Sequence, residues 1–337
     1  MSPSFSTLRR GSNSGASLLI AASILLLAPI VACAAPARGN DCSDAPPHAL
    51  NDDCLRFGIS NPGGPAALDE LERARQSAGQ PPTLILSFSD FTAPPPIHDL
   101  DAAVSFGAEP VVTWEPWHWL GEGEHDNAAF SLRSIADGLH DDYLYSWADQ
   151  LAAWGSTVYL RFAHEANGTW YPWSVEQGTS AHTYVAAWRH IHDLFASKGA
   201  SNVKWIWSPN VSFPGSSPIA DLYPGDRFVD VIGLDGYNWG TTHPWTRWID
   251  PTSLFGPTLD ELRAIAPGKP IVITEVGSAE AGGSKPEWIR ELIALLDEEE
   301  SVAAFIWFDH DKEADWRFSS TPEAAAAFAG ALHERLR

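Results

Sequence analysis

The chain has 337 residues, 45% of them hydrophobic, and a formal net charge of −22 at pH 7. This length suits a single α/β barrel with one large core. The acidic balance excludes nucleic acids and anionic polymers as partners and is compatible with a neutral substrate. The chain holds 16 tryptophans against 7 tyrosines. Tryptophan supplies flat apolar faces of the kind on which sugar rings stack.

Residues 1–34 form a predicted export signal. Two arginines precede an uncharged apolar run over residues 18–28, which is too short to span a bilayer comfortably. An A-x-A-like site around Cys33 would release a soluble protein. Residues 30–33 also resemble a bacterial lipobox, in which Cys33 would carry a lipid anchor. Both alternatives predict an exported protein, either secreted or held in the cell envelope as a periplasmic or lipid-anchored protein, and no later segment is apolar enough for a transmembrane helix.

Residues 35–56 are rich in Pro, Asp and Asn and indicate a linker before the main folded domain, which we place at 57–337. Cys42 and Cys54 lie in this linker, and a disulfide between them is expected in an oxidising compartment. The alternative is a pair of free thiols. A metal site is not expected, because two cysteines without a nearby histidine pair make a poor ligand set.

From residue 56 onward, short apolar runs alternate with helical patterns, which predicts a closed (β/α)₈ TIM barrel of the α/β class. An open doubly wound sheet is disfavoured, because no glycine-rich phosphate loop follows the first strand. The predicted strands cover residues 57–60, 83–88, 109–114, 157–164, 203–207, 229–234, 271–275 and 302–308. The clearest predicted helices cover residues 68–77, 143–154, 183–197, 259–265, 286–296 and 322–336.

Two of these strands end in carboxylates. Glu165 follows the fourth strand, and Glu275 ends the seventh. Catalytic residues of such barrels lie at the carboxyl ends of strands, and a glycosidase needs one proton donor and one carboxylate flanking the bond to be cleaved. The alternatives are an ion pair between Glu165 and Arg161 and a surface or helix-capping role for Glu275.

Five segments carry a resemblance to glycoside hydrolase family 26, and the resemblance runs from about residue 57 to about residue 318. The segments are RFAHEANGTWYPW (161–173), VVTWEPW (111–117), VKWIWSPN (203–210), VIGLDGYNWG (231–240) and VITEVGS (272–278). Members of this family are retaining endo-glycanases on a (β/α)₈ barrel. Most are β-1,4-mannanases, and some cleave mixed-linkage β-glucan or β-1,3-xylan.

The resemblance assigns roles to individual residues. It makes Glu165 the general acid/base and Glu275 the nucleophile. His164 would bind the sugar in the cleavage subsite, and Trp170 would line the cleft. Tyr237 would donate a hydrogen bond to the nucleophile.

Further candidates lie at the strand ends. By the same resemblance, Trp307 would be the platform under the sugar being cleaved. Arg161 is an expected donor to the nucleophile and a candidate sugar contact. Trp114 either lines a sugar subsite, together with Glu115 and Trp117, or plugs the barrel mouth. Asn210 is a polar candidate for the substrate site.

The predicted activity is therefore hydrolysis of a β-linked polysaccharide, with β-1,4-mannan as the expected substrate. The alternatives are a lichenase, a β-1,3-xylanase, or a barrel that binds carbohydrate without cleaving it. No cofactor and no resident metal are expected. A solvated loop is favoured over a cation site at residues 309–311. The protein is expected to act as a monomer.

Overall fold

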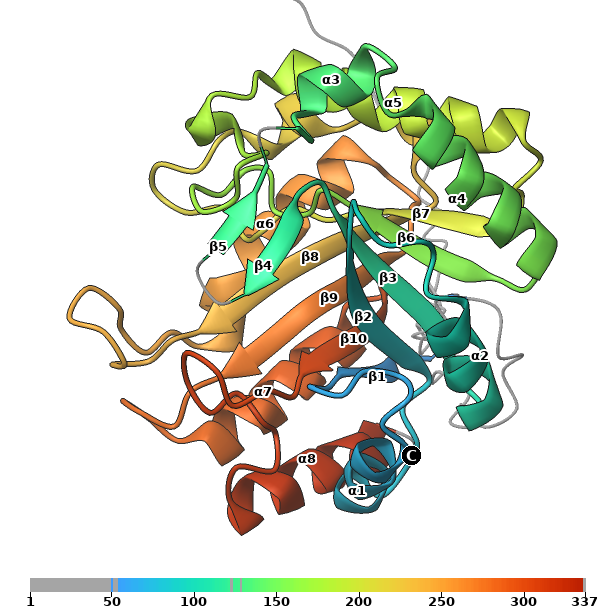
Figure 1. Ribbon diagram of the computed structural model, residues 1–337. Coiled ribbons are helices and arrows are strands. Elements are labelled where there is room, and N and C mark those ends of the chain that lie inside the picture. The colour runs from blue at the N-terminus through green and yellow to red at the C-terminus, as the bar shows by residue number, and fades with distance from the viewer. Residues whose placement is uncertain (1–49, 51–53, 122–123, 128, 336–337) are drawn as a thin grey trace, which may run out of the picture. The chain divides into compact units, whose positions relative to one another are not determined.

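A computed structural model describes residues 50, 54–121, 124–127 and 129–335. Eight parallel strands form a closed barrel in the spatial order β1-β10-β9-β8-β7-β6-β3-β2 (Figure 1). The strands are β1 (Arg56–Ser60), β2 (Leu84–Asp90), β3 (Glu109–Glu115), β6 (Val158–Phe162), β7 (Val203–Trp207), β8 (Val231–Asn238), β9 (Ile271–Ser278) and β10 (Val302–Phe308). The predicted barrel and all eight predicted strands are confirmed.

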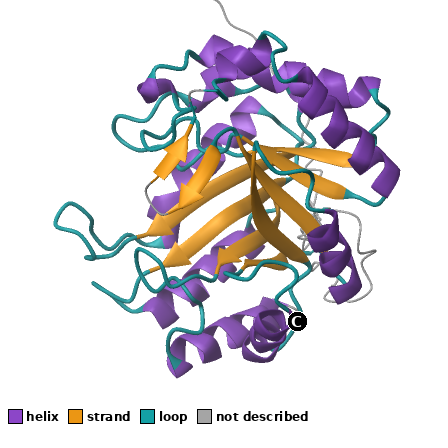
Figure 2. Cartoon of the chain, in the orientation of Figure 1, coloured by secondary structure: helices purple, strands orange, loops and turns teal. Residues whose placement is uncertain are grey.

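Helices cover the outer side of the barrel (Figure 2). They are α1 (Leu68–Ala78), α2 (Ile97–Phe106), α3 (Leu132–Ala136), α4 (Asp141–Trp154), α5 (Ala181–Ser197), α6 (Pro251–Ile265), α7 (Lys285–Glu298) and α8 (Pro322–Arg335). The six predicted helices are confirmed. Sequence analysis did not single out α2, α3 or the antiparallel hairpin of β4 (His118–Gly121) and β5 (Glu124–Asp126).

The predicted start of α6 at residue 259 is wrong, because the helix begins at Pro251. Asp250 caps it by accepting a 2.8 Å hydrogen bond from the Ser253 backbone N–H, and proline at the first helical position is pre-set for a helical φ. The Gly256-Pro257 pair lies inside the helix, although both residues normally interrupt helices.

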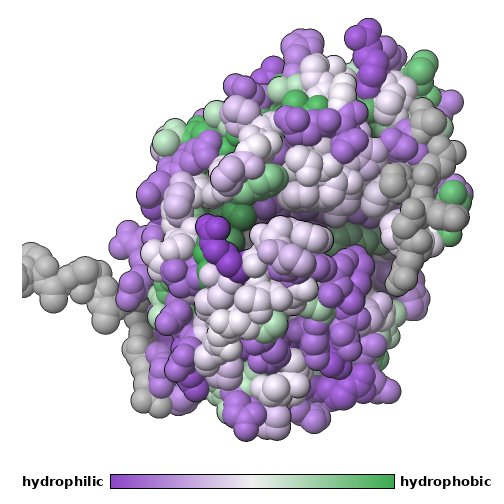
Figure 3. All heavy atoms as spheres, turned by 90° about the vertical axis from the view of Figure 1, so that its left-hand side faces the viewer, coloured by the Kyte–Doolittle hydropathy of each residue, from purple (hydrophilic) through white to green (hydrophobic). Residues whose placement is uncertain are grey.

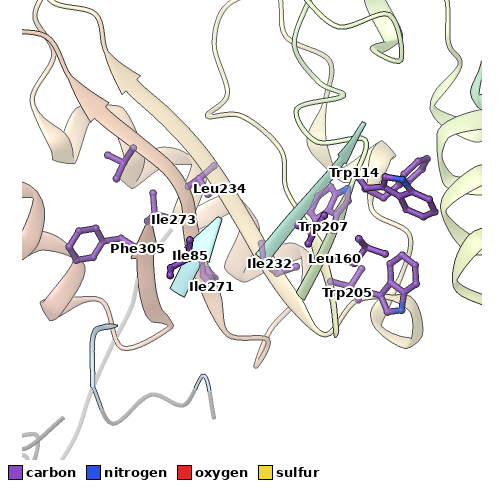
Figure 4. Packing of buried hydrophobic residues seen from close by; sticks show 14 of the residues in the cluster. Ile85, Trp114, Leu160, Trp205, Trp207, Ile232, Leu234, Ile271, Ile273 and Phe305 are labelled. Atoms are coloured by element: carbon purple, nitrogen blue, oxygen red, sulfur yellow. The ribbon is translucent and has the colours of Figure 1, made fainter. Parts of the chain in front are cut away.

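Side chains alternate between two cores along each strand, as the period of two requires. The larger core joins the strands to the helices and includes Ile85, Leu160, Ile232 and Phe305 (Figure 4). A second cluster fills the barrel with the intervening residues, which are Leu84, Leu86, Val111, Tyr159, Ile206, Val231, Val272, Ala304 and Ile306. Polar side chains of this inward-facing set lie at both ends of the barrel: Arg56 and Glu109 pair at the amino ends of β1 and β3, and a larger group gathers toward the carboxyl ends of the strands.

The predicted export signal, with Cys33, lies outside the described residues, as does Cys42. Cys54 is buried, and its pairing with Cys42 stays a prediction. Leu55 lies in the core and accepts a hydrogen bond from Arg335, so the packed part of the chain begins slightly before residue 57. Within the part of the chain that the structure describes, no helix combines the length and apolarity needed to cross a membrane.

Candidate active site

Glu275 reaches the barrel interior through an irregularity in β9. Leu234 of β8 pairs with Ile273, but the next residue, Asp235, pairs with Glu275, so β9 holds one extra residue here. Thr274 and Glu275 both face inward as a result: the Thr274 hydroxyl donates to Asp235 over 2.6 Å, and Glu275 contacts Arg161. Bulges of this kind often re-aim a side chain beside an active site.

Arg161 lies beneath Glu275 and has no exposed surface. Its guanidinium donates to Glu275 and, over 2.7 Å, to Asp235, while its Nε donates to Thr113 over 2.9 Å. A buried charge is tolerated only when it is paired and hydrogen-bonded, and both conditions hold here. Two carboxylates thus share one guanidinium.

Tyr237 supplies the second donor to Glu275. Its hydroxyl donates to Glu275 Oε2 over 2.6 Å. Burial, followed by the negative charge of Glu275, holds the pKa of Tyr237 well above its usual value, so the phenol keeps its proton. With a guanidinium on Oε1 and a phenol on Oε2, Glu275 sits in a setting that suits a carboxylate anion.

Glu165 follows β6 in a strained turn. Its φ is +53°, and that of Ala163 is +44°, a region that non-glycine residues rarely enter. Backbone hydrogen bonds hold the turn: the Glu165 N–H donates to the Ser208 carbonyl over 2.7 Å, and its carbonyl accepts from Gly168 over 2.8 Å. Strain of this kind persists only where the surroundings fix it, and here it aims a carboxyl group into the site.

The Glu165 carboxyl group is buried between two neutral donors. Asn210 Nδ2 donates to Oε1 over 2.6 Å, and the Trp170 indole donates to Oε2 over 2.7 Å. Burial, aided by the negative charge of Glu275, raises the pKa of Glu165 to about 7. The two carboxyl groups therefore differ: Glu165 holds a proton up to neutral pH, and Glu275 is set among cationic and phenolic donors.

The two residues beside Glu165 have different exposures. His164 is buried, and its Nε2 lies 3.0 Å from the Tyr171 hydroxyl. Burial, followed by the charge of Arg161, holds the pKa of His164 well below its usual value, so the ring is neutral. Trp170 is 46% exposed and stacks on Phe213 at 5.8 Å. Trp170 thus has an accessible surface next to Glu165, as a residue lining a cleft needs.

Glu115 is a further carboxyl group close to this site, besides Glu275, Asp235 and Glu165. It ends β3 with its side chain buried, and the Trp117 indole donates to it over 3.2 Å. Burial and the charge of Glu275 raise the pKa of Glu115 to about 8. Of the WEPW segment, Glu115 and not Trp114 faces the site.

Three predictions for individual residues are wrong, and strand alternation explains two of them. Trp307 is fully buried against Trp288 of α7 and Phe328 of α8, so no sugar can stack on it. Trp114 is also fully buried and stacks on Trp147 of α4 at 4.2 Å, so it neither lines a subsite nor plugs the barrel mouth. Both tryptophans stand on the helix-facing side of their strands.

The third correction concerns Arg161. Its predicted contact with a sugar is wrong, because the side chain is fully buried beneath the carboxylates. Its predicted donation to Glu275 is confirmed. Sequence analysis also missed the hydroxyl groups of Thr113, Ser208 and Thr274. The sequence pointed to them only by placing a Ser or Thr within or just after an apolar strand.

Replacing Trp307 by alanine should lower the free energy of unfolding by about 3–5 kcal/mol, as for other large side chains removed from cores. The KM for substrate should stay within about twofold, because Trp307 does not reach the site. Urea denaturation and initial rates measure both quantities. Trp245→Ala is a matched control with an 80% exposed indole, and its stability should change by about 0.5 kcal/mol at most. An unchanged stability with a raised KM would contradict the burial of Trp307.

The loop at residues 309–311 is held by protein contacts. Asp309 accepts a 3.0 Å hydrogen bond from the Phe318 N–H, and His310 lies 3.1 Å from the Ser60 hydroxyl. Asp311 pairs with Arg317 at 3.5 Å. Among the described residues, no three His, Cys, Asp or Glu side chains converge to hold a metal ion.

A (β/α)₈ barrel with one protonated and one donor-bound carboxyl group at the ends of its fourth and seventh strands has the form of a glycoside hydrolase. The model of the family described as glycosyl hydrolase family 26 matches residues 132–318, more than half of the chain. The chain belongs to this family.

Curated relatives are named as an endoglucanase, as mannan endo-1,4-beta-mannosidases and as beta-1,3-xylanases. Endoglucanase H of Acetivibrio thermocellus is 39% identical over 238 residues, which are 69% of this chain and 25% of that protein. A mannan endo-1,4-beta-mannosidase of Bacillus subtilis is 31% identical over 169 residues, which are 48% of this chain and 39% of that protein. The "mannan endo-1,4-beta-mannosidase A and B" of Caldalkalibacillus mannanilyticus is 30% identical over 55% of this chain and 33% of that protein. The chain thus spans well under half of each of these relatives.

Solved structures share the fold. The catalytic domain of a Bacillus sp. family 26 endo-beta-1,4-mannanase aligns with a TM-score of 0.63 and 20% identity, covering 84% of this chain and 87% of that one. An endo-beta-1,4-mannanase of Cellulomonas fimi aligns with a TM-score of 0.61 and 20% identity, covering 84% and 71%. These likenesses establish the barrel and no more.

Proposed function

We propose that this chain is a retaining endo-β-glycanase in which Glu165 is the general acid/base and Glu275 the nucleophile. The observation that carries the proposal is the unequal setting of the two carboxyl groups. Glu165 is buried among neutral donors with a pKa raised to about 7, whereas Glu275 receives hydrogen bonds from Arg161 and Tyr237. A carboxyl group that keeps its proton, opposite a carboxylate held by hydrogen-bond donors, is the arrangement that a proton donor and a nucleophile need.

The proposed reaction has two displacements. Glu275 attacks the anomeric carbon, the glycosidic bond breaks, and Glu165 gives its proton to the departing oxygen, leaving a covalent glycosyl-enzyme. Glu165 then takes a proton from water, whose oxygen attacks the same carbon and releases Glu275. Arg161 and Tyr237 hold the Glu275 carboxylate in place through both steps. Trp170 and Asn210 hydrogen-bond to Glu165, and the exposed part of Trp170 lines the proposed cleft. The sugar contact predicted for His164 stays a proposal, and its side chain is buried beside Glu165.

We propose β-1,4-mannan as the leading substrate, which the names of the two mannosidase relatives support. A β-glucan is the second candidate, favoured by the higher identity to endoglucanase H. Mannan is ranked first because two relatives carry that name and because the chain spans a larger share of them, 33% and 39%, than of endoglucanase H, at 25%.

Release of reducing ends from mannan, lichenan and β-1,3-xylan tests the proposal. We expect the wild-type chain to cleave mannan, and a β-glucan is the second candidate substrate. Glu165→Ala and Glu275→Ala are the inactive controls. Binding to these glycans without turnover of any would overturn the proposed activity and favour a barrel that only binds carbohydrate.

The pH profile should follow the protonation of Glu165. Activity needs the protonated acid, so kcat/KM should fall as the pH rises through about 7, which is the raised pKa of Glu165. An aryl glycoside whose leaving group needs no proton should lose this alkaline limb in the glycosylation step. A limb at the ordinary pKa of a carboxyl group, or one shared by both substrates, would contradict the role given to Glu165.

We also propose that the protein is exported by the signal in residues 1–34, with two alternatives: cleavage at the A-x-A-like site around Cys33, or a lipid anchor on Cys33. The charge and apolar pattern of the segment supports export. Intact mass of the mature protein distinguishes the outcomes: a lipidated Cys33 at the first position, cleavage at the A-x-A-like site, or an uncleaved chain, which would contradict both alternatives.

A further inference from the structure

The loop between β8 and α6 carries the most exposed large hydrophobic side chain of the described residues. Trp245 is 80% exposed, while most tryptophans of the barrel are buried. The loop reaches outward beyond the carboxyl ends of the strands (Figure 1). The same face of the molecule is hollowed across its middle, with hydrophobic residues within the hollow (Figure 3). An exposed indole at the rim of a site offers a large apolar face to a ligand.

The Trp245 indole is supported from behind. It stacks on the His243 ring at 4.9 Å with an interplanar angle of 5°, and His243 packs on Trp239 at 5.5 Å. The turn between them is fixed by Thr246, whose N–H donates to the His243 carbonyl over 3.1 Å and whose hydroxyl accepts from the His243 N–H over 3.1 Å. One face of the indole is thus held against the protein, and the other is free.

The base of the loop is closed by one buried side chain. Asn238, at the end of β8, accepts hydrogen bonds from the N–H groups of Gly240 and Ile249 over 3.2 and 3.1 Å. Gly240 has a φ of +53°, and a Cβ there would lie 1.8 Å from the Ala281 carbonyl oxygen, so only glycine fits. These contacts pre-organise the loop before any ligand binds.

A row of ring contacts leads from this loop to the candidate nucleophile. Trp239 packs edge-on against Trp316 at 4.8 Å, and Trp316 packs against Tyr237 at 5.0 Å. Tyr237 is the residue whose hydroxyl donates to Glu275. The exposed indole is therefore continuous with the site around Glu275, at its outer end.

We propose that Trp245, backed by His243, is a distal subsite that stacks on a pyranose ring of a β-linked glycan chain bound across Glu275. The inference rests on the proposed glycanase function. A flat, half-supported indole matches the apolar C–H face of a neutral sugar. The net charge of −22 disfavours an anionic polymer and a second copy of this chain as the occupant. The subsite serves long chains, because it lies away from the bond that is cleaved.

Kinetics over a ladder of glycan chain lengths test the subsite. Trp245→Ala should lower kcat/KM by about tenfold on polysaccharide and on long oligosaccharides, which is the scale of one aromatic stacking contact. The loss should shrink as the oligosaccharide shortens, and Trp245→Tyr should recover most of it. Tyr145→Ala is the matched control, because Tyr145 is an exposed aromatic residue on α4. It should show no loss at any length.

The outcomes separate the two proposals. If the wild-type chain cleaves no glycan, the proposed function fails and the subsite fails with it. The wild-type chain can be active while Trp245→Ala has the same kcat/KM at every chain length, or a kcat/KM lowered by the same factor at every length. Either result overturns only the subsite. Loss of self-association in sedimentation, with unchanged kinetics, would instead assign Trp245 to a contact between copies of the chain.

Discussion

Replacing Glu275 by alanine should abolish turnover of every glycan that the wild-type chain cleaves, lowering kcat by about 10⁴-fold or more, as when other catalytic nucleophiles are removed. The substitution removes the group that attacks the anomeric carbon and leaves Arg161 and Tyr237 without their acceptor. Reducing-end release measures the loss. Glu291→Ala is a matched control, because Glu291 is an exposed residue of α7, and it should keep full activity.

Chemical rescue sharpens the test of Glu275. Azide can occupy the space left by the carboxylate and attack the anomeric carbon of a reactive aryl β-glycoside, displacing the aryl oxide from the opposite face. Attack on the β-glycoside inverts the centre once, so the expected product is the α-glycosyl azide. Substantial activity of Glu275→Ala without added azide would contradict a nucleophilic role for Glu275 and make Glu115, a further buried carboxyl group nearby, the next candidate to test.

Replacing Glu165 by alanine should lower activity on natural glycans by about 10²–10⁴-fold, the usual contribution of general acid/base catalysis. The loss should depend on the leaving group. An aryl glycoside with a good leaving group should still form the glycosyl-enzyme, which then accumulates because no base activates water. Stopped-flow measurement should detect the resulting burst. Glu176→Ala, at an exposed glutamate nearby in the same loop, should behave as wild type.

Azide should rescue Glu165→Ala differently from Glu275→Ala. It would attack the accumulated glycosyl-enzyme without needing a base, so the rate should rise and the product should be the β-glycosyl azide. An α-glycosyl azide, or an equal loss on natural and activated substrates with no burst, would show that Glu165 does not act as the acid/base.

The barrel could be predicted from sequence because its strands are short apolar runs buried on both sides. Where such a run is apolar throughout, the sequence does not show which side of the strand each residue faces. In β10 the run VAAFIWF has no polar residue to mark the period, so Trp307 could not be placed on the helix-facing side. In β3 the period was marked, because the polar Thr113 and Glu115 flank Trp114, and the prediction overlooked this alternation. Where a strand ended in polar residues, as β6 does near Glu165, position in the barrel was predictable.

The network beneath Glu275 was harder to predict, because its members come from different strands. Arg161, Asp235, Thr274 and Ser208 meet only through the register between β6, β7, β8 and β9. The extra residue in β9 turns Thr274 and Glu275 to the same side, which a strict period of two forbids. The strained turn at Glu165 is likewise fixed by a carbonyl on another segment, Ser208.

Proton NMR of the first sugar released from a mannan or β-glucan oligosaccharide tests the paired roles of Glu165 and Glu275 most directly. Two displacements retain configuration, so the β anomer of the new reducing end should appear first and then mutarotate toward equilibrium. If the α anomer appears first, a single displacement by water has occurred, and Glu275 is not the nucleophile.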